Sequence, residues 1–245
     1  MGPRAALRTK RQPARATAAE AAGLRWLRVE GGPPVPVVHS ASEGTLVIDE
    51  IPHGEPDLQA AVTFGRRLAA LHLTGAPAFG SPPPGGPREA TIGMASMINE
   101  PAPEWPSWFA SQRIEPYARQ AGIDVTEVCA RIESLAGPAE PPARLHGDLW
   151  SGNVLWGADG QVWLIDPAAH GGHRESDLAM LRLFGCPFLD HVLGAYREVA
   201  PLADGWEARV ALHQLFPLLV HAVLFGGGYR AQAAAAAKSA LRGSS

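Results

Sequence analysis

The sequence predicts an α+β protein, with a small strand-containing part at residues 1–52 and a larger, mainly helical part at residues 53–245. Two runs rich in β-branched residues lie within the first part and are separated by a polar turn. Beyond residue 52, apolar residues mostly recur every three or four positions, as on one face of a helix. A short hairpin pattern, centred on Ala158-Asp159-Gly160, interrupts the helical stretches.

The composition is that of a folded protein with a small-molecule partner. Of 245 residues, 46% are hydrophobic and 18% charged, enough for one large core or two modest ones. The net charge of −3 gives no general attraction to nucleic acid or to an anionic membrane, and neither is expected as a partner. No apolar run of 18 residues and no signal-peptide pattern is found, so we expect a cytoplasmic protein. The oligomeric state is left open.

The first predicted elements are a strand and a helix. Residues 5–10 have the pattern of a short strand. Thr17-Ala18-Ala19-Glu20 is a capping-box pattern, which predicts a helix that begins near residue 18 and runs to Gly31-Gly32.

Two further strands are predicted at Val35–Val38 and Thr45–Ile51, joined by the polar turn Ser40–Gly44. Pro36 cannot donate a backbone hydrogen bond, so it places the first of them at a sheet edge.

The larger part is predicted to be helical with one long extended connection. Residues 75–104 are rich in Pro, Gly and Ala, which favours irregular structure. Pro217 is expected to kink the helix that contains it. Helices are predicted at 58–71, 105–119, 125–135, 174–184, 189–199, 206–228 and 229–242.

The most informative segment runs from His146 to Leu155 and is followed by Ile165-Asp166-Pro167. Four residues separate Asp148 from Asn153, and the hairpin returns the chain so that Asp166 faces Asn153. This spacing is typical of a site that transfers a phosphoryl group to a hydroxyl. Asp148 would accept the hydroxyl proton. Asn153 and Asp166 would supply hard oxygen ligands to Mg²⁺.

The chain resembles the fructosamine kinase (ketosamine kinase) family in three segments: His146–Val154 (HGDLWSGNV), Ile165-Asp166-Pro167 and Gly172–Ala179. This family lies within the aminoglycoside phosphotransferase-like branch of the protein-kinase-like fold. The resemblance is specific at Leu149-Trp150 and covers most of the chain. It implies two lobes: a small lobe at 1–52, and a large helical lobe at 53–245 that carries the catalytic loop and a metal-binding hairpin.

The resemblance also implies the activity. Members use ATP and Mg²⁺ to phosphorylate the third hydroxyl of the sugar part of a ketoamine, and the phosphorylated adduct then breaks down and frees the amine. The implied substrate is a small-molecule or protein-bound ketoamine, and the implied process is deglycation.

Several site residues follow from the resemblance. Lys10 and Glu20 would be the strand lysine and helix glutamate that hold the ATP phosphates. Arg8 competes with Lys10 for this position, and Glu20 also has a structural explanation in the capping box. The backbone around Glu50 and Ile51 would meet adenine.

Three more residues have expected positions in or beside the catalytic loop. Trp150 would give the sugar a flat apolar wall, with a loop-anchoring core tryptophan as the alternative. His146 would hold the loop by hydrogen bonds, and Asp177 would support it from the following helix.

Complete members carry two strands and a glycine-rich loop before the lysine strand, whereas this chain begins almost at that strand. We therefore expect a truncated small lobe, and an inactive nucleotide-binding protein is an alternative. A kinase of another small hydroxyl substrate, such as an aminoglycoside or choline, is a second alternative. A metal hydrolase built on His170, His173 and Glu175 is a third, weakened by the glycines between them.

Overall fold

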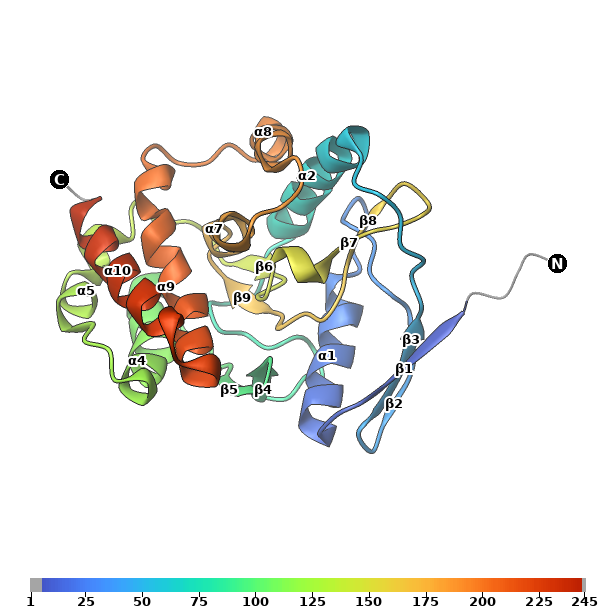
Figure 1. Ribbon diagram of the computed structural model, residues 1–245, viewed down its shortest axis with the longest axis horizontal. Coiled ribbons are helices and arrows are strands. Elements are labelled where there is room, and N and C mark those ends of the chain that lie inside the picture. The colour runs from blue at the N-terminus through green and yellow to red at the C-terminus, as the bar shows by residue number, and fades with distance from the viewer. Residues whose placement is uncertain (1–5, 244–245) are drawn as a thin grey trace.

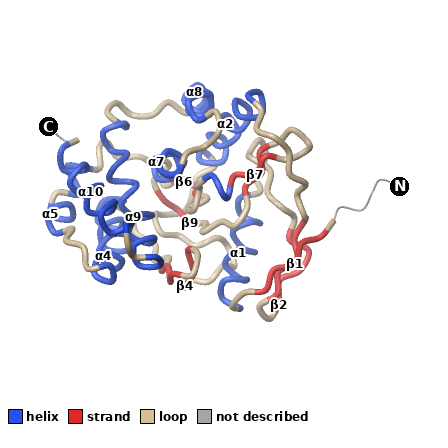
Figure 2. The backbone as a smooth tube through the Cα atoms, in the orientation of Figure 1, coloured by secondary structure: helices blue, strands red, loops and turns tan. Residues whose placement is uncertain are grey.

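The computed structural model describes residues 6–243. A small antiparallel sheet and one long helix lie at the end of the molecule that carries the N-terminus (Figure 1). Helices gather at the opposite end, and short strands lie between the two regions (Figure 2). The predicted α+β class is therefore confirmed.

The small sheet has the strand order β1-β3-β2, with both neighbouring pairs antiparallel. Its strands are β1 (Leu7–Arg11), β2 (Val38–Ser42) and β3 (Thr45–Asp49). Glu43 and Gly44 join β2 to β3 with φ of 47° and 80°, as a tight hairpin turn requires. The predicted strand at Val35–Val38 was wrong, because the strand begins at Val38, beyond the prolines that lack a donor.

Helix α1 (Ala14–Leu27) follows β1 directly and begins four residues before the predicted start. The capping-box prediction was wrong. Thr17 lies inside the helix and is buried, and its backbone N–H donates to the carbonyl of Pro13 at 3.0 Å. The helix starts early because Pro13 cannot pair in the sheet and is followed by helix-forming alanines. The Glu20 carboxylate is thereby free for residues outside the helix.

The connection predicted at residues 75–104 contains a hairpin that the sequence analysis missed. It follows α2 (Leu58–Leu73), which was predicted, and consists of β4 (Glu89–Ile92) and β5 (Ala95–Ile98). The hairpin is fixed from the helical side. The Tyr117 hydroxyl donates to the carbonyl of Ser96 at 2.6 Å, and the buried Arg113 guanidinium donates to the carbonyl of Ile98 at 2.8 Å.

The remaining elements match the predicted helical part, with several breaks. The predicted helix at 105–119 contains a π-helical turn, and the one at 125–135 is two short helices. Pro217 lies inside one helix, Trp206–Phe225, and the kink expected there stays a prediction. The elements are α3 (Trp105–Trp108), η1 (Phe109–Ile114), α4 (Glu115–Ala121), α5 (Thr126–Ala130), α6 (Ile132–Leu135), β6 (Ala143–Leu145), η2 (Ser151–Asn153), β7 (Val154–Trp156), β8 (Val162–Leu164), β9 (His170–Gly172), α7 (Glu175–Phe184), α8 (Leu189–Val199), α9 (Trp206–Phe225) and α10 (Gly228–Arg242).

One hydrophobic core crosses the expected lobe boundary at residue 52. Leu46 and Ile48 of β3 belong to the same buried cluster as Leu68 of α2 and Leu149 of the expected catalytic loop, residues 146–153. A second cluster lies among α3–α6, α9 and α10. The division into lobes at residue 52 stays a prediction, but the strands and the catalytic loop share one packing unit.

Helix α9 is long and apolar enough to cross a membrane, by length and composition alone. Its residues are 56% buried inside the protein, and its neighbours are α7 and α10. The same features are found in the core helix of a globular protein.

Candidate functional site

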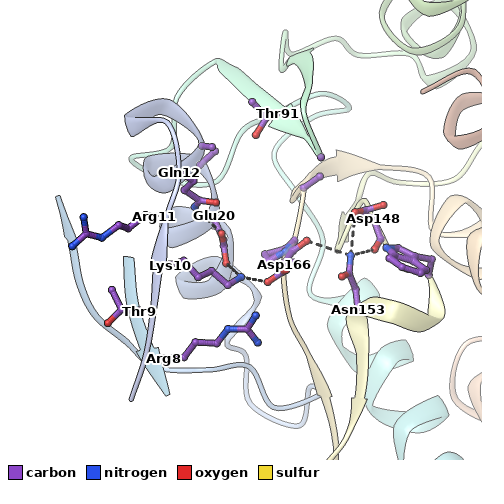
Figure 3. Close-up of a pocket in the computed structure, with 16 residues that line it drawn as sticks. Arg8, Thr9, Lys10, Arg11, Gln12, Glu20, Thr91, Asp148, Asn153 and Asp166 are labelled. Carbon is purple, nitrogen blue, oxygen red and sulfur yellow. Dashed lines mark hydrogen bonds and ion pairs between the residues drawn. The ribbon is translucent and has the colours of Figure 1, made fainter. Parts of the chain in front are cut away.

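A cavity of about 570 Å³ lies where the small sheet, α1, the β4–β5 turn and the catalytic loop meet. Figure 3 shows its side chains, with Lys10 and Glu20 on one side, Asp148 on the other, and Asp166 and Asn153 between them. The lining residues are Arg8, Thr9, Lys10, Arg11, Gln12, Ala16, Ala19, Glu20, Thr91, Gly93, Asp148, Trp150, Asn153, Asp166, Pro167 and Ala168.

Asp148 and Asn153, the last residue of the 3₁₀ turn η2, form one hydrogen-bonded unit. Asn153 Nδ2 donates to the backbone carbonyl of Asp148 at 2.8 Å and to its Oδ2 at 3.0 Å. The same nitrogen lies 3.5 Å from the carbonyl oxygen of Asp166. The three residues named by the sequence motif therefore converge in space.

Asp177 of α7 binds the backbone of the catalytic loop, as expected from the sequence. Its buried carboxylate accepts hydrogen bonds from the backbone N–H groups of His146 at 2.8 Å and Gly147 at 3.0 Å. His72 Nε2 lies 3.2 Å from the same carboxylate, a contact that the sequence did not indicate. Gly147 has φ of 80°, and a Cβ there would lie 2.2 Å from the carbonyl oxygen of Ala168. No other residue fits this position.

His146 ties the loop to the hairpin that carries Asp166. It is fully buried, and burial lowers its pKa, so the ring is neutral at pH 7. Its Nδ1 accepts from the backbone N–H of Asp148 at 3.3 Å, which leaves Nε2–H to donate to the carbonyl of Ile165 at 2.9 Å. His146 therefore links the loop directly to the residue before Asp166.

Lys10 connects the small sheet to the motif. Its Nζ lies 2.7 Å from Glu20 Oε1 and also pairs with the Asp166 carboxylate. Gln12 Nε2 donates to the other oxygen of Glu20 at 2.8 Å. Arg8 lines the same cavity but makes none of these contacts. In the described structure, Lys10 is thus the cation paired with Glu20.

Asp148 has the electrostatic properties of a proton acceptor near neutral pH. Burial raises the pKa of its carboxyl from 3.8 to about 7, and the nearby carboxylates of Asp177 and Asp166 add to this shift. The hydrogen bond from Asn153 opposes it by stabilising the ionised form.

The oxygens of Asn153 and Asp166 fit a divalent cation. Because Asn153 uses its NH₂ group on Asp148, its Oδ1 remains without a hydrogen bond from any described residue. The Asp166 carboxylate is 45% exposed and faces the cavity, and Lys10 pairs with its Oδ1 only, so its Oδ2 has no hydrogen bond from a described residue. Asp166 adopts φ of 53°, a left-handed conformation that aspartate tolerates better than most residues. A neutral carbonyl and a carboxylate are the ligand types that Mg²⁺ prefers.

Trp150 lines the cavity beside Asp148 and is 37% exposed, so it is not a core residue. Its ring lies over Gly152, where a Cβ would meet three ring atoms at 2.3–2.6 Å. The glycine therefore permits the ring position as well as the loop turn.

Two predicted residues are not in the cavity. Glu50 and Ile51 follow β3, and the backbone N–H of Glu50 donates to the carbonyl of Ala6 at 2.8 Å. Ala6 precedes Lys10 by four residues, which is about 13 Å along a strand. The adenine contact stays a prediction.

Several lining residues were not predicted from the sequence. Thr91 and Gly93 come from the β4–β5 hairpin, and Gln12 comes from the turn after β1. The alternation Glu89-Ala90-Thr91-Ile92 before Gly93 was the signal that pointed to a strand and turn.

The metal-hydrolase alternative does not fit the structure. Glu175, His173 and His213 do place ligand atoms within 4.8 Å of one another, whereas His170 is not part of this group. Both oxygens of Glu175, however, accept hydrogen bonds from Arg209, at 2.6 Å and 2.9 Å. A guanidinium in this position satisfies the carboxylate and repels a cation.

Comparison with known proteins gives a family match over nearly the whole described chain. The family model described as fructosamine kinase matches residues 7–243. A probable ketoamine kinase of Synechocystis sp. is 35% identical over 218 residues, covering 85% of this chain and 72% of that protein. A crystal structure of a candidate fructosamine-3-kinase from Thermobifida fusca has a TM-score of 0.86 and 50% identity, covering 91% of this chain and 79% of the other.

More distant structures show the fold alone. The choline kinase LicA of Streptococcus pneumoniae has a TM-score of 0.62 at 14% identity, covering 99% of this chain and 88% of the other. Aminoglycoside phosphotransferases are also among the structural neighbours. The fold is therefore protein-kinase-like, as the sequence resemblance implied.

Proposed function

Because the chain belongs to the fructosamine kinase family, we propose that it is an ATP-dependent kinase that phosphorylates a sugar hydroxyl of ketoamines. One observation carries the proposal: a proton-accepting carboxylate, two oxygen ligands and a lysine share one cavity. The cytoplasmic location stays a prediction.

Each side chain has a task that its contacts support. Asp148, in its ionised form, accepts the proton of the attacking hydroxyl, and Asn153 holds its Oδ2 in place at 3.0 Å. Lys10 neutralises phosphate charge, and its pairing with Glu20 at 2.7 Å fixes the ammonium. Asn153 Oδ1 and the Asp166 carboxylate would hold Mg²⁺. When bound, Mg–ATP supplies the phosphoryl group and the divalent charge that offsets its oxygens.

The cavity favours a ketoamine over a polycationic acceptor. Its lining contains three acidic residues, Glu20, Asp148 and Asp166. Glu20 is neutralised by Lys10, and the other two belong to the transfer chemistry in our proposal. No lining carboxylate remains for an aminoglycoside, whereas Trp150 offers a flat surface to a sugar ring. Transfer to the third hydroxyl and release of the amine rest on the family resemblance.

The test is ADP release by the purified chain with fructosyl-lysine, ribulosyl-lysine, choline and an aminoglycoside. We expect turnover of at least one of the two ketoamines and no turnover of choline or the aminoglycoside. Faster turnover of choline or the aminoglycoside would move the chain to another substrate class. Mg–ATP binding without transfer to any of the four would favour the inactive nucleotide-binding alternative.

A further inference from the structure

Five aromatic rings form a continuous strip that begins in the catalytic cavity. We call Trp150, Phe184, His221, Phe225 and Tyr229 the aromatic strip. Ring centroids are 6.0 Å apart for Trp150 and Phe184, 5.0 Å for Phe184 and His221, and 5.6 Å for His221 and Phe225. Tyr229 of α10 lies 5.0 Å from His221. The strip thus joins the catalytic loop to the end of α7 and the junction of α9 and α10.

The strip lies on the acceptor side of the cavity. The side chains proposed to hold the nucleotide, Lys10, Glu20 and Asp166, lie on the opposite side of Asn153 from Asp148 (Figure 3). Trp150, the first ring, lines the cavity together with Asp148. Leu224, the residue before Phe225, lies near the cavity-lining Gly93, where a Cβ would be 3.6 Å from Leu224 Cδ1.

The strip is apolar and open at its outer end. Phe225 is 67% exposed, although the other rings at that end are partly buried. His221 donates Nδ1–H to the carbonyl of Pro217 at 2.7 Å, which fixes its ring. Within the described residues, none of the five rings pairs with an acidic side chain.

We propose that the aromatic strip binds the amine component of the ketoamine, so that the enzyme selects substrates by the carbon chain of the amine. This inference rests on the proposed function. The acceptor hydroxyl must reach Asp148, so the sugar lies beside Trp150 and the amine substituent continues over the neighbouring rings. The protonated amine is attracted to aromatic faces, and a methylene chain such as the lysine stem packs on them.

The experiment compares two fructose ketoamines that share the sugar and differ by three methylene groups, those of methylamine and butylamine. The measured quantity is the ratio of their kcat/KM values. Burial of one side of each methylene should raise kcat/KM about twofold. For the wild type we therefore expect a ratio of about ten in favour of the butylamine ketoamine. Phe225→Ala and Phe184→Ala should each lower this ratio towards two or less. Leu73→Ala, an exposed apolar residue outside the cavity, is the control and should keep it.

Both kcat/KM values are measured on the same preparation of each variant, so a smaller fraction of folded protein lowers both equally and leaves their ratio unchanged. A wild-type ratio near one, or a ratio of ten retained in both phenylalanine variants, would overturn the inference and leave the proposed function standing. Failure of the wild type to phosphorylate either ketoamine would overturn the proposed function, and the inference with it.

Discussion

Replacing Asp148 with asparagine should abolish activity and yet stabilise the protein at high pH. The change removes a carboxylate that burial disfavours and retains an oxygen that can accept the hydrogen bond from Asn153 at 3.0 Å. Without the base, kcat should fall by about 10²- to 10⁴-fold. A residue selected for structure would instead destabilise the fold when replaced.

The magnitude follows from the pKa of Asp148, which is 3.8 ordinarily and about 7 in the folded protein. Because the folded-state pKa is raised, this carboxyl's contribution to stability is fully present below pH 3.8 and is lost as the pH rises through about 7. At about 1.4 kcal/mol per pKa unit, the raised pKa of Asp148 lowers the free energy of unfolding by up to about 4 kcal/mol at pH 8, where the folded protein holds the ionised carboxylate, but by under about 2 kcal/mol at pH 5, where the folded protein keeps the carboxyl protonated.

The assay is thermal melting of wild type and Asp148→Asn at pH 5 and pH 8. We expect the melting temperature of the variant, relative to wild type, to rise by about 5–10 °C between the two pH values. Asp190→Asn, an exposed position on α8, serves as the matched control and should show the same difference at both. If the difference in melting temperature between Asp148→Asn and wild type does not change with pH, burial does not raise the pKa of Asp148.

The same pKa also predicts the pH dependence of activity. In wild type, kcat/KM should rise up to about pH 7, as Asp148 ionises, and then level off.

Four further substitutions test Asp166, Lys10, Arg8 and the position of the Trp150 ring. Asp166→Asn, which keeps a side chain that tolerates left-handed backbone, should lose most of the thermal stabilisation by Mg–ATP; an undiminished shift would remove Asp166 from the cation site. Lys10→Met should raise KM for ATP at least tenfold, whereas Arg8→Met should change it less than threefold, and the reverse order in steady-state kinetics would assign the phosphate contact to Arg8. Gly152→Ala should displace the Trp150 ring and lower kcat/KM for the ketoamine by about tenfold with little change in KM for ATP, and equal losses for both substrates would contradict a role on the acceptor side.

Local sequence patterns were reliable where the residues involved are close in the chain. Asp148 and Asn153 are joined by one short turn, and the β7–β8 hairpin brings Asp166 back to them. Turn geometry and strand pairing set these positions with little help from the rest of the molecule. The motif therefore predicted the convergence that the structure shows.

Patterns failed where a distant partner decided the outcome. Thr17 and Glu20 have capping-box spacing, but Glu20 instead pairs with Lys10 and Gln12 on the preceding strand and turn. The β4–β5 hairpin was hidden among prolines and glycines, and it is held by Arg113 and Tyr117, which are remote in sequence. The strand and helix propensities of the residues carry no information about such contacts.

The sequence by itself determined the α+β class, the family resemblance and the chemistry available at residues 148, 153 and 166, because these depend on composition and short spacings. Only the tertiary structure decided which of Arg8 and Lys10 pairs with Glu20. Both residues lie on β1 and line the cavity, and the packing of α1 against this strand decides that Glu20 meets Lys10. The aromatic strip likewise exists only after folding, since its rings come from four segments whose contacts no local pattern encodes.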